Sequence, residues 1–363
     1  MYSRVYPALV FLIVLVSKAL SLRMSGKAGA NPLGLTLQQT MLRIKDPKVS
    51  VPFYEQNFGF KLLHKYDFPE WKFSLAFMGI PKEGQEWPEP GTKESEKALW
   101  SMEYSCLELT HNWGSEDDDN FRVNHGNTEP HRGFGHIAVM TPDVEAACEK
   151  LEQNGCLFQK KPNEGRMKGL AFVKDPDGYW IEVISRSAGS EVPSTIPFTL
   201  AQTMLRVKDA QRSLAFYREH LGMSLLRETH FGPDRGDFSL YFLASLPPGT
   251  DIPDPTDANA GEFIKKMYPQ VLELTHNHGT ENDPDFKYHN GNDVDANLDM
   301  IQGFGHTGFL VDSLEDTVKY MDSKSVPFRK RPEDGAMKEI AFVLDPDGYS
   351  VELIQKNGFS TFD

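Results

Sequence analysis

Polar side chains that can bind a metal interrupt apolar, strand-like segments in the first half of the chain. Glu108 stands between Leu107 and Leu109, and Glu182 stands between Ile181 and Val183. Gln39 and His136 occupy similar positions in two other such segments. A carboxylate inside an apolar strand is costly unless its charge is paired or bound to a metal. One such Glu is ordinarily a solvent-facing residue of an amphipathic strand, so recurrence is needed to argue otherwise.

The same four residue types recur in the same order in the second half. They are Gln202, Glu273, His306 and Glu352, which follow their counterparts by 163, 165, 170 and 170 residues. Longer motifs recur with them: LQQTMLR as LAQTMLR, LELTHN unchanged, RGFGH as QGFGH, and DPDGY unchanged. A long ordered repeat indicates two homologous domains. Oxygen donors with one imidazole suit a divalent cation in an open, water-bearing site.

The predicted strands and helices that carry these residues repeat in one order. In the first copy we predict a strand at 36–44, a helix opened by Asp46-Pro47 and ended by Gly59, and three further strands. The three strands cover about 60–66, 72–78 and 103–110, with a loop at 81–97 before the last one. A second cycle follows, with a strand at 135–140, a helix at 143–154, and strands at 158–161, 170–174 and 179–184. The sequence therefore predicts an α+β fold of four βαβββ modules, which pair because each is too small to bury a core.

The predicted domain organisation follows from this repeat and from composition. It is a leader at 1–32, a first domain at 33–186, a Ser/Gly/Pro-rich linker at 187–197, a second domain at 198–357 and a tail at 358–363. The 363 residues carry 52 acidic and 38 basic side chains, a formal charge of −14. This charge repels phosphate backbones, so nucleic acid is excluded as an expected partner. Three cysteines offer neither a disulfide framework nor a zinc-finger spacing, so metal ligands must be nitrogen and oxygen.

The first 30 residues have the composition of a targeting leader. Arg4 precedes an apolar run at 8–16, which is shorter than the about 20 residues that span a bilayer. A basic stretch with Arg23 and Lys27 follows, and no acidic residue appears before Asp46. We expect delivery to a plastid bounded by extra membranes or to the endomembrane system, with no stable membrane partner after the leader is removed. Initiation at Met24 would instead give a cytoplasmic protein.

These motifs, together with KKPNEGRMKG and DPDGYWIE, resemble glyoxalase I, the lactoylglutathione lyase family, in its fused two-domain eukaryotic form. The resemblance covers 33–185 and, more loosely, 198–355. It implies a vicinal oxygen chelate fold, a monomer, and metal sites between the domains that each take two ligands from either side. Site 1 would comprise Gln202, Glu273, His136 and Glu182. Site 2 would comprise Gln39, Glu108, His306 and Glu352.

The resemblance also implies a reaction. The hemithioacetal of methylglyoxal and glutathione would become S-D-lactoylglutathione by a proton transfer between adjacent carbons. Zn²⁺ is the implied cofactor, although Ni²⁺ or Co²⁺ also accepts such donors. Glu182 and Glu352 would act as the catalytic bases, with Glu273 and Glu108 opposite them. Glutathione would be the co-substrate, and a different thiol remains an alternative.

Glutathione has two carboxylates, which the family binds with cations and amides. In site 1 the matching residues are Arg206, Asn277, Arg132, Lys160 and Arg166. In site 2 they are Arg43, Asn112 and Lys330, but Gln302 and Ala336 replace two expected cations. One lost charged contact typically costs about 1.5–3 kcal/mol, so we predict that site 1 binds glutathione better.

Two other functions are compatible with the same fold. Extradiol dioxygenases need two histidines and one carboxylate, and this chain has Gln39 and Gln202 where they have histidine. A non-catalytic binding protein predicts missing metal ligands, and none is missing. His111 and His276 follow the Glu that already fills the metal position, so we interpret them as structural or supporting residues.

Overall fold

The computed structural model describes residues 26–298 and 300–362. Residues 1–25 of the predicted leader lie outside this range. Among the described residues, none of the helices combines the length and the apolar character needed to span a bilayer.

Each repeat contains the predicted cycle twice. The first repeat comprises β2 (Thr36–Ile44), α2 (Pro47–Phe58), β3 (Lys61–Phe68), β4 (Phe73–Gly79), α3 (Lys93–Leu99), β5 (Cys106–Asn112), β6 (Phe134–Thr141), α4 (Val144–Gln153), β7 (Leu157–Lys160), β8 (Ala171–Lys174) and β9 (Trp180–Ser185). The second comprises β10 (Thr199–Val207), α5 (Ala210–Ala215), β11 (Ser224–Phe231), β12 (Phe238–Ala244), α6 (Ala260–Ile264), β14 (Val271–Asn277), β15 (Phe304–Val311), α7 (Leu314–Ser323), β16 (Phe328–Lys330), β17 (Ile340–Leu344) and β18 (Ser350–Gln355). A short pair, β1 (Gly26–Lys27) with β13 (Asp251–Ile252), lies outside these cycles. The predicted α+β class and the βαβββ plan are confirmed.

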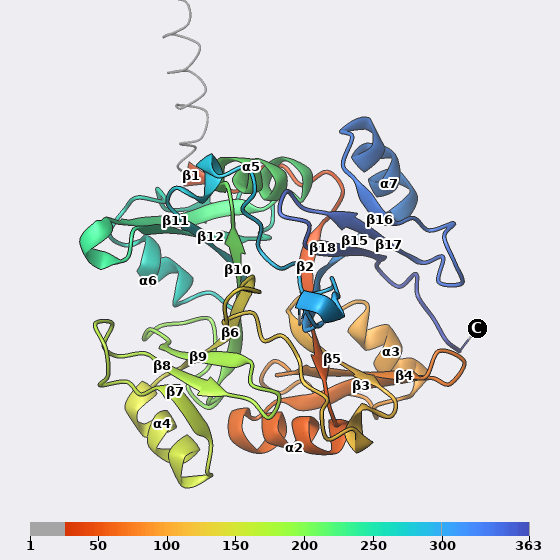
Figure 1. Cartoon of the computed structure of the whole chain (residues 1–363), viewed down its shortest axis with the longest axis horizontal. Coiled ribbons are helices and arrows are strands. Elements are labelled where there is room, and N and C mark those ends of the chain that lie inside the picture. Colours follow the sequence, from red (N-terminus) through yellow and green to blue (C-terminus); the bar gives the residue numbers. More distant parts are fainter. Residues whose placement is uncertain (1–25, 299, 363) are drawn as a thin grey trace, which may run out of the picture.

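The strands form two eight-stranded sheets, and each sheet takes four strands from each repeat. Their orders are β11-β12-β14-β10-β6-β9-β8-β7 and β16-β17-β18-β15-β2-β5-β4-β3. The repeats meet at the centre of each sheet, where β10 pairs antiparallel with β6 and β15 pairs antiparallel with β2. Figure 1 shows the two sheets side by side, with helices α2 and α4 of the first repeat below and α5 and α7 of the second above. Each module therefore continues its sheet with a module of the other repeat.

The two modules of one repeat are joined by side chains instead. Tyr54 on α2 donates a hydrogen bond of 2.9 Å to Asp175 in the first DPDG turn, and Lys45 N donates one of 2.8 Å to Asp177. In the second repeat, Tyr217 contacts Asp345 in the same way. Asp46 caps the start of helix α2, where its side chain accepts from Lys48 N. Gly59 caps the end with φ 69°, a left-handed conformation that favours glycine.

The two sheets share one continuous apolar core that includes residues of both repeats. Within it the rings of Phe134 and Phe304 stack with 5.2 Å between centroids and an interplanar angle of 8°. The hydroxyls of Thr40 and Thr203, another equivalent pair, are 2.5 Å apart. Equivalent residues thus meet each other where the two repeats are related by symmetry.

One predicted loop is wrong in part. The segment 81–97 was expected to lack regular structure, but α3 begins at Lys93 within it and runs to Leu99. Thr92 caps this helix by accepting from Ser95 N, while the Ser95 hydroxyl accepts from Thr92 N. This capping box offsets the low apolar content of the segment, which masked the helix in the sequence.

Candidate metal centres and substrate cavity

The strand register brings four ligand-type side chains together in each sheet. In the first sheet, Met204 on β10 lies opposite His136 on β6 and beside Glu273 on β14. Ala138 on β6 lies opposite Gln202 on β10 and beside Glu182 on β9. Because side chains two residues apart on a strand share a face, the four polar side chains converge on one point at the junction of the repeats.

At site 1 the four side chains are buried and in mutual contact. Gln202 Nε2 donates to Glu182 Oε2 over 2.8 Å and to Glu273 Oε2 over 2.7 Å. His136 Nε2 lies 3.4 Å from Glu182 Oε2 and 3.5 Å from Glu273 Oε2.

Site 2 repeats this geometry with the other halves of the repeats. Gln39 Nε2 donates to Glu108 Oε2 over 2.8 Å and to Glu352 Oε2 over 2.7 Å. His306 Nε2 lies 3.1 Å and 3.0 Å from the same two oxygens. The structure thus brings together all eight residues that the sequence placed at metal sites.

The donor set fits a divalent cation. In each cluster the ligand atoms of the His and the two Glu lie within 4.8 Å of one another. Gln39 Oε1 is buried and has no hydrogen-bond partner among the described residues. Rotating this amide by 180° would point that oxygen at the two carboxylates. The oxygens would then repel one another unless a cation lay between them. Site 2 would then offer three oxygen ligands and one nitrogen ligand, from Gln39, Glu108, His306 and Glu352. Site 1 would offer the same set of ligand atoms.

The histidines are held beside negative charge. Burial alone lowers the pKa of His306, but the charges of Glu352 and Glu108 and the hydrogen bonds to them raise it to about 10. At site 1, burial is likewise outweighed by hydrogen bonds and charge from Glu182 and Glu273, which raise the pKa of His136 to about 9. Each cluster is therefore an anionic pocket that favours a bound positive charge.

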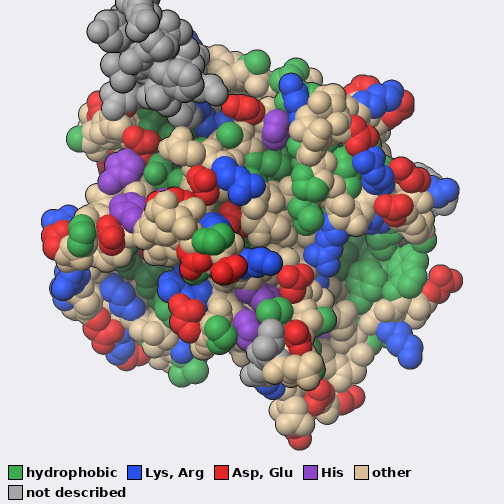
Figure 2. Space-filling view, turned by 45° about the horizontal axis from the view of Figure 1, so that its top comes forward, with side chains coloured by type: hydrophobic (Ala, Val, Ile, Leu, Met, Phe, Trp, Pro, Cys, Tyr) green, Lys and Arg blue, Asp and Glu red, His purple; other side chains and the backbone are tan. Residues whose placement is uncertain are grey.

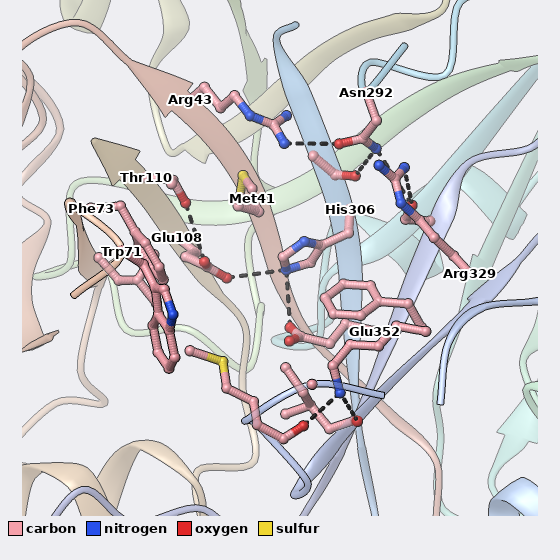
Figure 3. Close-up of a pocket in the computed structure, with 18 of the residues that line it drawn as sticks. Met41, Arg43, Trp71, Phe73, Glu108, Thr110, Asn292, His306, Arg329 and Glu352 are labelled. Carbon is pink, nitrogen blue, oxygen red and sulfur yellow. Dashed lines mark hydrogen bonds and ion pairs between the residues drawn. The ribbon is translucent and has the colours of Figure 1, made fainter. Parts of the chain in front are cut away.

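A cavity of about 600 Å³ opens over site 2. Figure 3 shows Glu108, His306 and Glu352 on its floor, with Trp71 and Phe73 forming one wall and Arg43, Asn292 and Arg329 at the other side. On the molecular face of Figure 2, acidic and basic side chains are interspersed, and an apolar area is bordered by Lys and Arg side chains. An amphipathic ligand with anionic groups suits such a cavity.

The predicted substrate contacts of site 2 line this cavity. They are Arg43, Asn112 and Lys330, together with the non-cationic Gln302 and Ala336. Arg43 donates to Asn292 Oδ1 over 2.9 Å and to the Gly303 carbonyl over 3.2 Å. Lys330 Nζ donates to the carbonyls of Met337 and Ile340. Backbone carbonyls and an amide thus fix both cations in the wall.

At site 1 the predicted cations already have partners. Arg206 donates to Asn127 Oδ1 over 2.8 Å, and Lys160 Nζ donates to the Leu170 carbonyl over 2.6 Å. Arg132 is paired with Glu129 at 3.0 Å. Arg166 Nη1 donates to the Asp234 carbonyl over 2.7 Å and so bridges from the first repeat to the second. Asn277 donates to the Tyr288 hydroxyl.

Some wall residues were missed in the sequence. Asn127 and Asn292 hold Arg206 and Arg43, and Arg329 lines the cavity of site 2. Asn127 and Asn292 could have been found in the sequence, because each ends a recurring segment, HGN or HNGN, before a GFGH motif. Arg329 could not be found in this way, because the first repeat has no arginine at the equivalent position. His111 contacts Glu116 at 2.7 Å and His276 contacts Glu281 at 2.8 Å, in keeping with structural roles.

Comparisons with known proteins agree with this geometry. The model of the Glyoxalase/Bleomycin resistance protein/Dioxygenase superfamily matches residues 36–183 and again 199–353. A glyoxalase I of Saccharomyces cerevisiae is 43% identical over 335 residues, covering 90% of this chain and 94% of the yeast protein. The chain belongs to the glyoxalase I family.

Other relatives extend the comparison. A lactoylglutathione lyase of Schizosaccharomyces pombe is 39% identical over 88% of this chain and 96% of its own. The crystal structure of glyoxalase I from Zea mays has a TM-score of 0.63 at 26% identity, covering 90% of this chain and 94% of the maize chain. Family membership and the fused two-domain form, both expected from the motifs, are confirmed.

Proposed function

We propose that this protein is a lactoylglutathione lyase, which converts the hemithioacetal of methylglyoxal and glutathione to S-D-lactoylglutathione. The observation that carries the proposal is the pair of buried Gln-Glu-His-Glu clusters, each assembled from both repeats. The names of the yeast relatives support the same reaction.

The reaction requires a base that removes a proton from one carbon and returns it to the next. In each cluster one carboxylate is more firmly held than the other. Glu108 Oε1 accepts a further hydrogen bond from the Thr110 hydroxyl at 3.3 Å, and Glu273 Oε1 has a longer contact with Thr275. In the described part of the chain, Oε1 of Glu182 or Glu352 has no such contact. We therefore assign Glu182 and Glu352 as the bases, because a carboxylate with a free oxygen can accept a proton.

Burial supports this assignment at site 2. It raises the pKa of Glu352, although the charge of His306 opposes the shift. A carboxylate with a raised pKa is the stronger base. When bound, a divalent cation such as Zn²⁺ supplies Lewis-acid stabilisation of the negative charge that develops on the substrate oxygens. The four residues that would hold that cation at site 2 are Gln39, Glu108, His306 and Glu352.

The cations of the walls would orient glutathione through its carboxylates. Arg43, Asn112 and Lys330 would do so at site 2, and Arg206, Asn277, Arg132, Lys160 and Arg166 at site 1. Apolar side chains such as Trp71 and Phe73 would exclude water from the reacting carbons.

Thioester formation tests the proposal. Purified protein should generate thioester absorbance from methylglyoxal and glutathione, lose this activity on chelation and regain it with Zn²⁺. Metal analysis of the same sample identifies the resident ion among Zn²⁺, Ni²⁺ and Co²⁺. A metal-reconstituted protein without activity would refute the lyase assignment, and oxygen uptake with a catechol would support a dioxygenase instead.

Location and assembly are separate parts of the proposal. We infer that the leader directs the protein to a plastid or the endomembrane system, and that the mature chain is a monomer. Fluorescent protein fused to residues 1–32 should enter one of these compartments, whereas diffuse cytoplasmic signal would favour initiation at Met24. Sedimentation equilibrium should give the mass of one chain.

A further inference from the structure

Among the differences between the walls of the two sites, four bear on where their cations lie. Two of the differences remove cations from site 2: Gln302 stands where site 1 has Arg132, and Ala336 stands where it has Arg166. The other two place an arginine and a small residue in site 2. Arg329 on β16 stands where the first repeat has Gln159, and Ser350 on β18 stands where it has Trp180.

The structure explains why the last two changes belong together. Arg329 Nη1 donates to the Ser350 hydroxyl over 3.2 Å. At site 1 the equivalent position holds the indole of Trp180, whose ring lies 5.5 Å from that of Phe172. An indole in place of Ser350 would fill the space and offer no acceptor for a guanidinium. The small hydroxyl residue therefore permits the arginine to lie along the cavity wall.

Arg329 extends a polar chain that reaches into the cavity. Asn292 Nδ2 contacts the Ser350 hydroxyl at 3.4 Å, and Asn292 Oδ1 accepts from Arg43 Nη2 at 2.9 Å. Figure 3 shows this chain from Arg329 to Arg43 on one side of the cavity, with Glu352 and His306 on the floor. Two guanidinium groups thus face one cavity, and an anionic ligand would relieve their mutual repulsion.

Arg329 is also available for a ligand. It is exposed at the rim, and in the ranges 26–298 and 300–362 no carboxylate forms an ion pair with it. Arg331, two residues further along, is instead paired with Asp322 on α7 at 2.6 Å and lies over the Phe328 ring. Neighbouring arginines therefore have different environments.

We propose that Arg329 binds a carboxylate of the thiol co-substrate at site 2, in place of the cations lost at Gln302 and Ala336. This inference rests on the proposed lyase function. It predicts that the two sites take the same class of ligand, a peptide thiol with two carboxylates, through differently placed arginines.

Kinetics in a chain with site 1 silenced test the inference. In a Glu182→Gln background, Arg329→Gln introduces the residue that site 1 carries. We expect KM for the glutathione hemithioacetal to rise roughly tenfold or more, with kcat little changed, because a charge-assisted contact is lost. Arg331→Gln removes the same charge two residues away and should leave KM unchanged. An equal effect of both variants, or no effect of Arg329→Gln, would overturn the inference.

Modified co-substrates distinguish a direct contact from a structural effect. In the Glu182→Gln background, glutathione amidated at either carboxylate should have a higher KM than glutathione. When Arg329→Gln is added, this increase in KM should disappear for one of the two amides. Arg329→Lys should retain part of the discrimination, and it also serves if Arg329→Gln does not fold. Penalties that stay equal in all variants would exclude a carboxylate contact.

The two proposals fail in different ways. If the metal-loaded natural chain does not turn over the glutathione hemithioacetal, the lyase function is wrong. If that chain is active but Glu182→Gln abolishes all turnover, or if the Arg329 variants keep the parental KM, only the inference about site 2 is wrong.

Discussion

Single residues determine the relative activity of the two sites. Glu182 and Glu352 occupy equivalent positions on β9 and β18, yet they face differently charged walls. From the cations at Arg132 and Arg166, site 1 is predicted to bind glutathione better. Arg329 offsets part of that difference, so the ranking must be measured with each site silenced in turn.

The first prediction concerns these two bases. Each single variant, Glu182→Gln or Glu352→Gln, should retain the turnover of the other site, and the double variant should lose roughly a hundredfold or more, as expected for a missing general base. Initial rates with zinc-loaded protein provide the measurement, and metal content per chain provides the control. Loss of most turnover in Glu352→Gln alone would contradict the ranking of site 1 as the stronger site.

The buried Asp175 predicts a pH dependence of stability. Burial raises the pKa of Asp175 to about 7, and the charge of Asp177 adds to this, against hydrogen bonds from Tyr54 and the Tyr179 and Asp177 amides. With rising pH, the unfolded chain loses this proton near its ordinary pKa and the folded chain only near 7. The free energy of unfolding should therefore fall between about pH 4 and 7, relative to Asp175→Asn.

Urea unfolding of both proteins at pH 5 and pH 8 measures this difference. Asp345→Asn provides a second case, since burial raises the pKa of Asp345 to about 7 as well. If the stability difference between each variant and the natural chain is the same at both pH values, the carboxyl groups do not titrate in this range.

At the scale of elements, the C-terminal tail completes one wall of site 2. Phe359 packs against Tyr66 and Trp100, with ring centroids 5.5 and 5.9 Å away. Glu96 on α3 holds the next residues, since it accepts from the Ser360 hydroxyl and the Thr361 amide. A recess of about 40 Å³ lies between Phe359 and the site 2 carboxylates. The tail thus limits the space beside the reacting carbons.

Removing this ring should change substrate preference. In the Glu182→Gln background, Phe359→Ala should raise the rate with phenylglyoxal relative to methylglyoxal, because the enlarged recess accommodates a larger aldehyde substituent. Phe362→Ala is a suitable control, because that ring is 46% exposed and near the same end. A preference that is unchanged by Phe359→Ala would show that another element limits the substituent.

The same scale shows what the sequence could predict. The strands and main helices were predictable because period-two segments and caps such as Asp46 and Gly59 recur in both repeats. Helix α3 was missed because its charged sequence hides the cap at Thr92. Arg329 was missed because it lies outside the shared motifs, and only its distance to Ser350 in the folded chain reveals its role.

For the whole molecule, the pairing of strands between repeats has a consequence for fragments. Residues 33–190 carry Gln39, Glu108, His136 and Glu182, but β2 and β6 each lose one of their two neighbouring strands, β15 and β10, when the second repeat is removed. We predict that this fragment does not fold as a monomer, because each half-sheet would expose a central strand edge. A dimer in which β2 of one copy pairs with β6 of the other would restore both sheets.

Sedimentation and circular dichroism of the purified fragment measure this outcome. A folded fragment with the mass of a single copy would show that strand pairing between the repeats is dispensable. Zinc binding by a dimer would further indicate that the ligand clusters re-form from two first repeats.

The shared sheets also determine how the two sites can diverge in evolution. Because each repeat supplies two ligands to each site, replacing one repeat by a copy of the other would make both sites alike at once. The differences at Gln302, Arg329 and Ala336 lie in the second half of one repeat, and that half serves site 2 alone. Each site is therefore inherited as a pair of half-repeats, the two central ones for site 1 and the two at the ends of the chain for site 2.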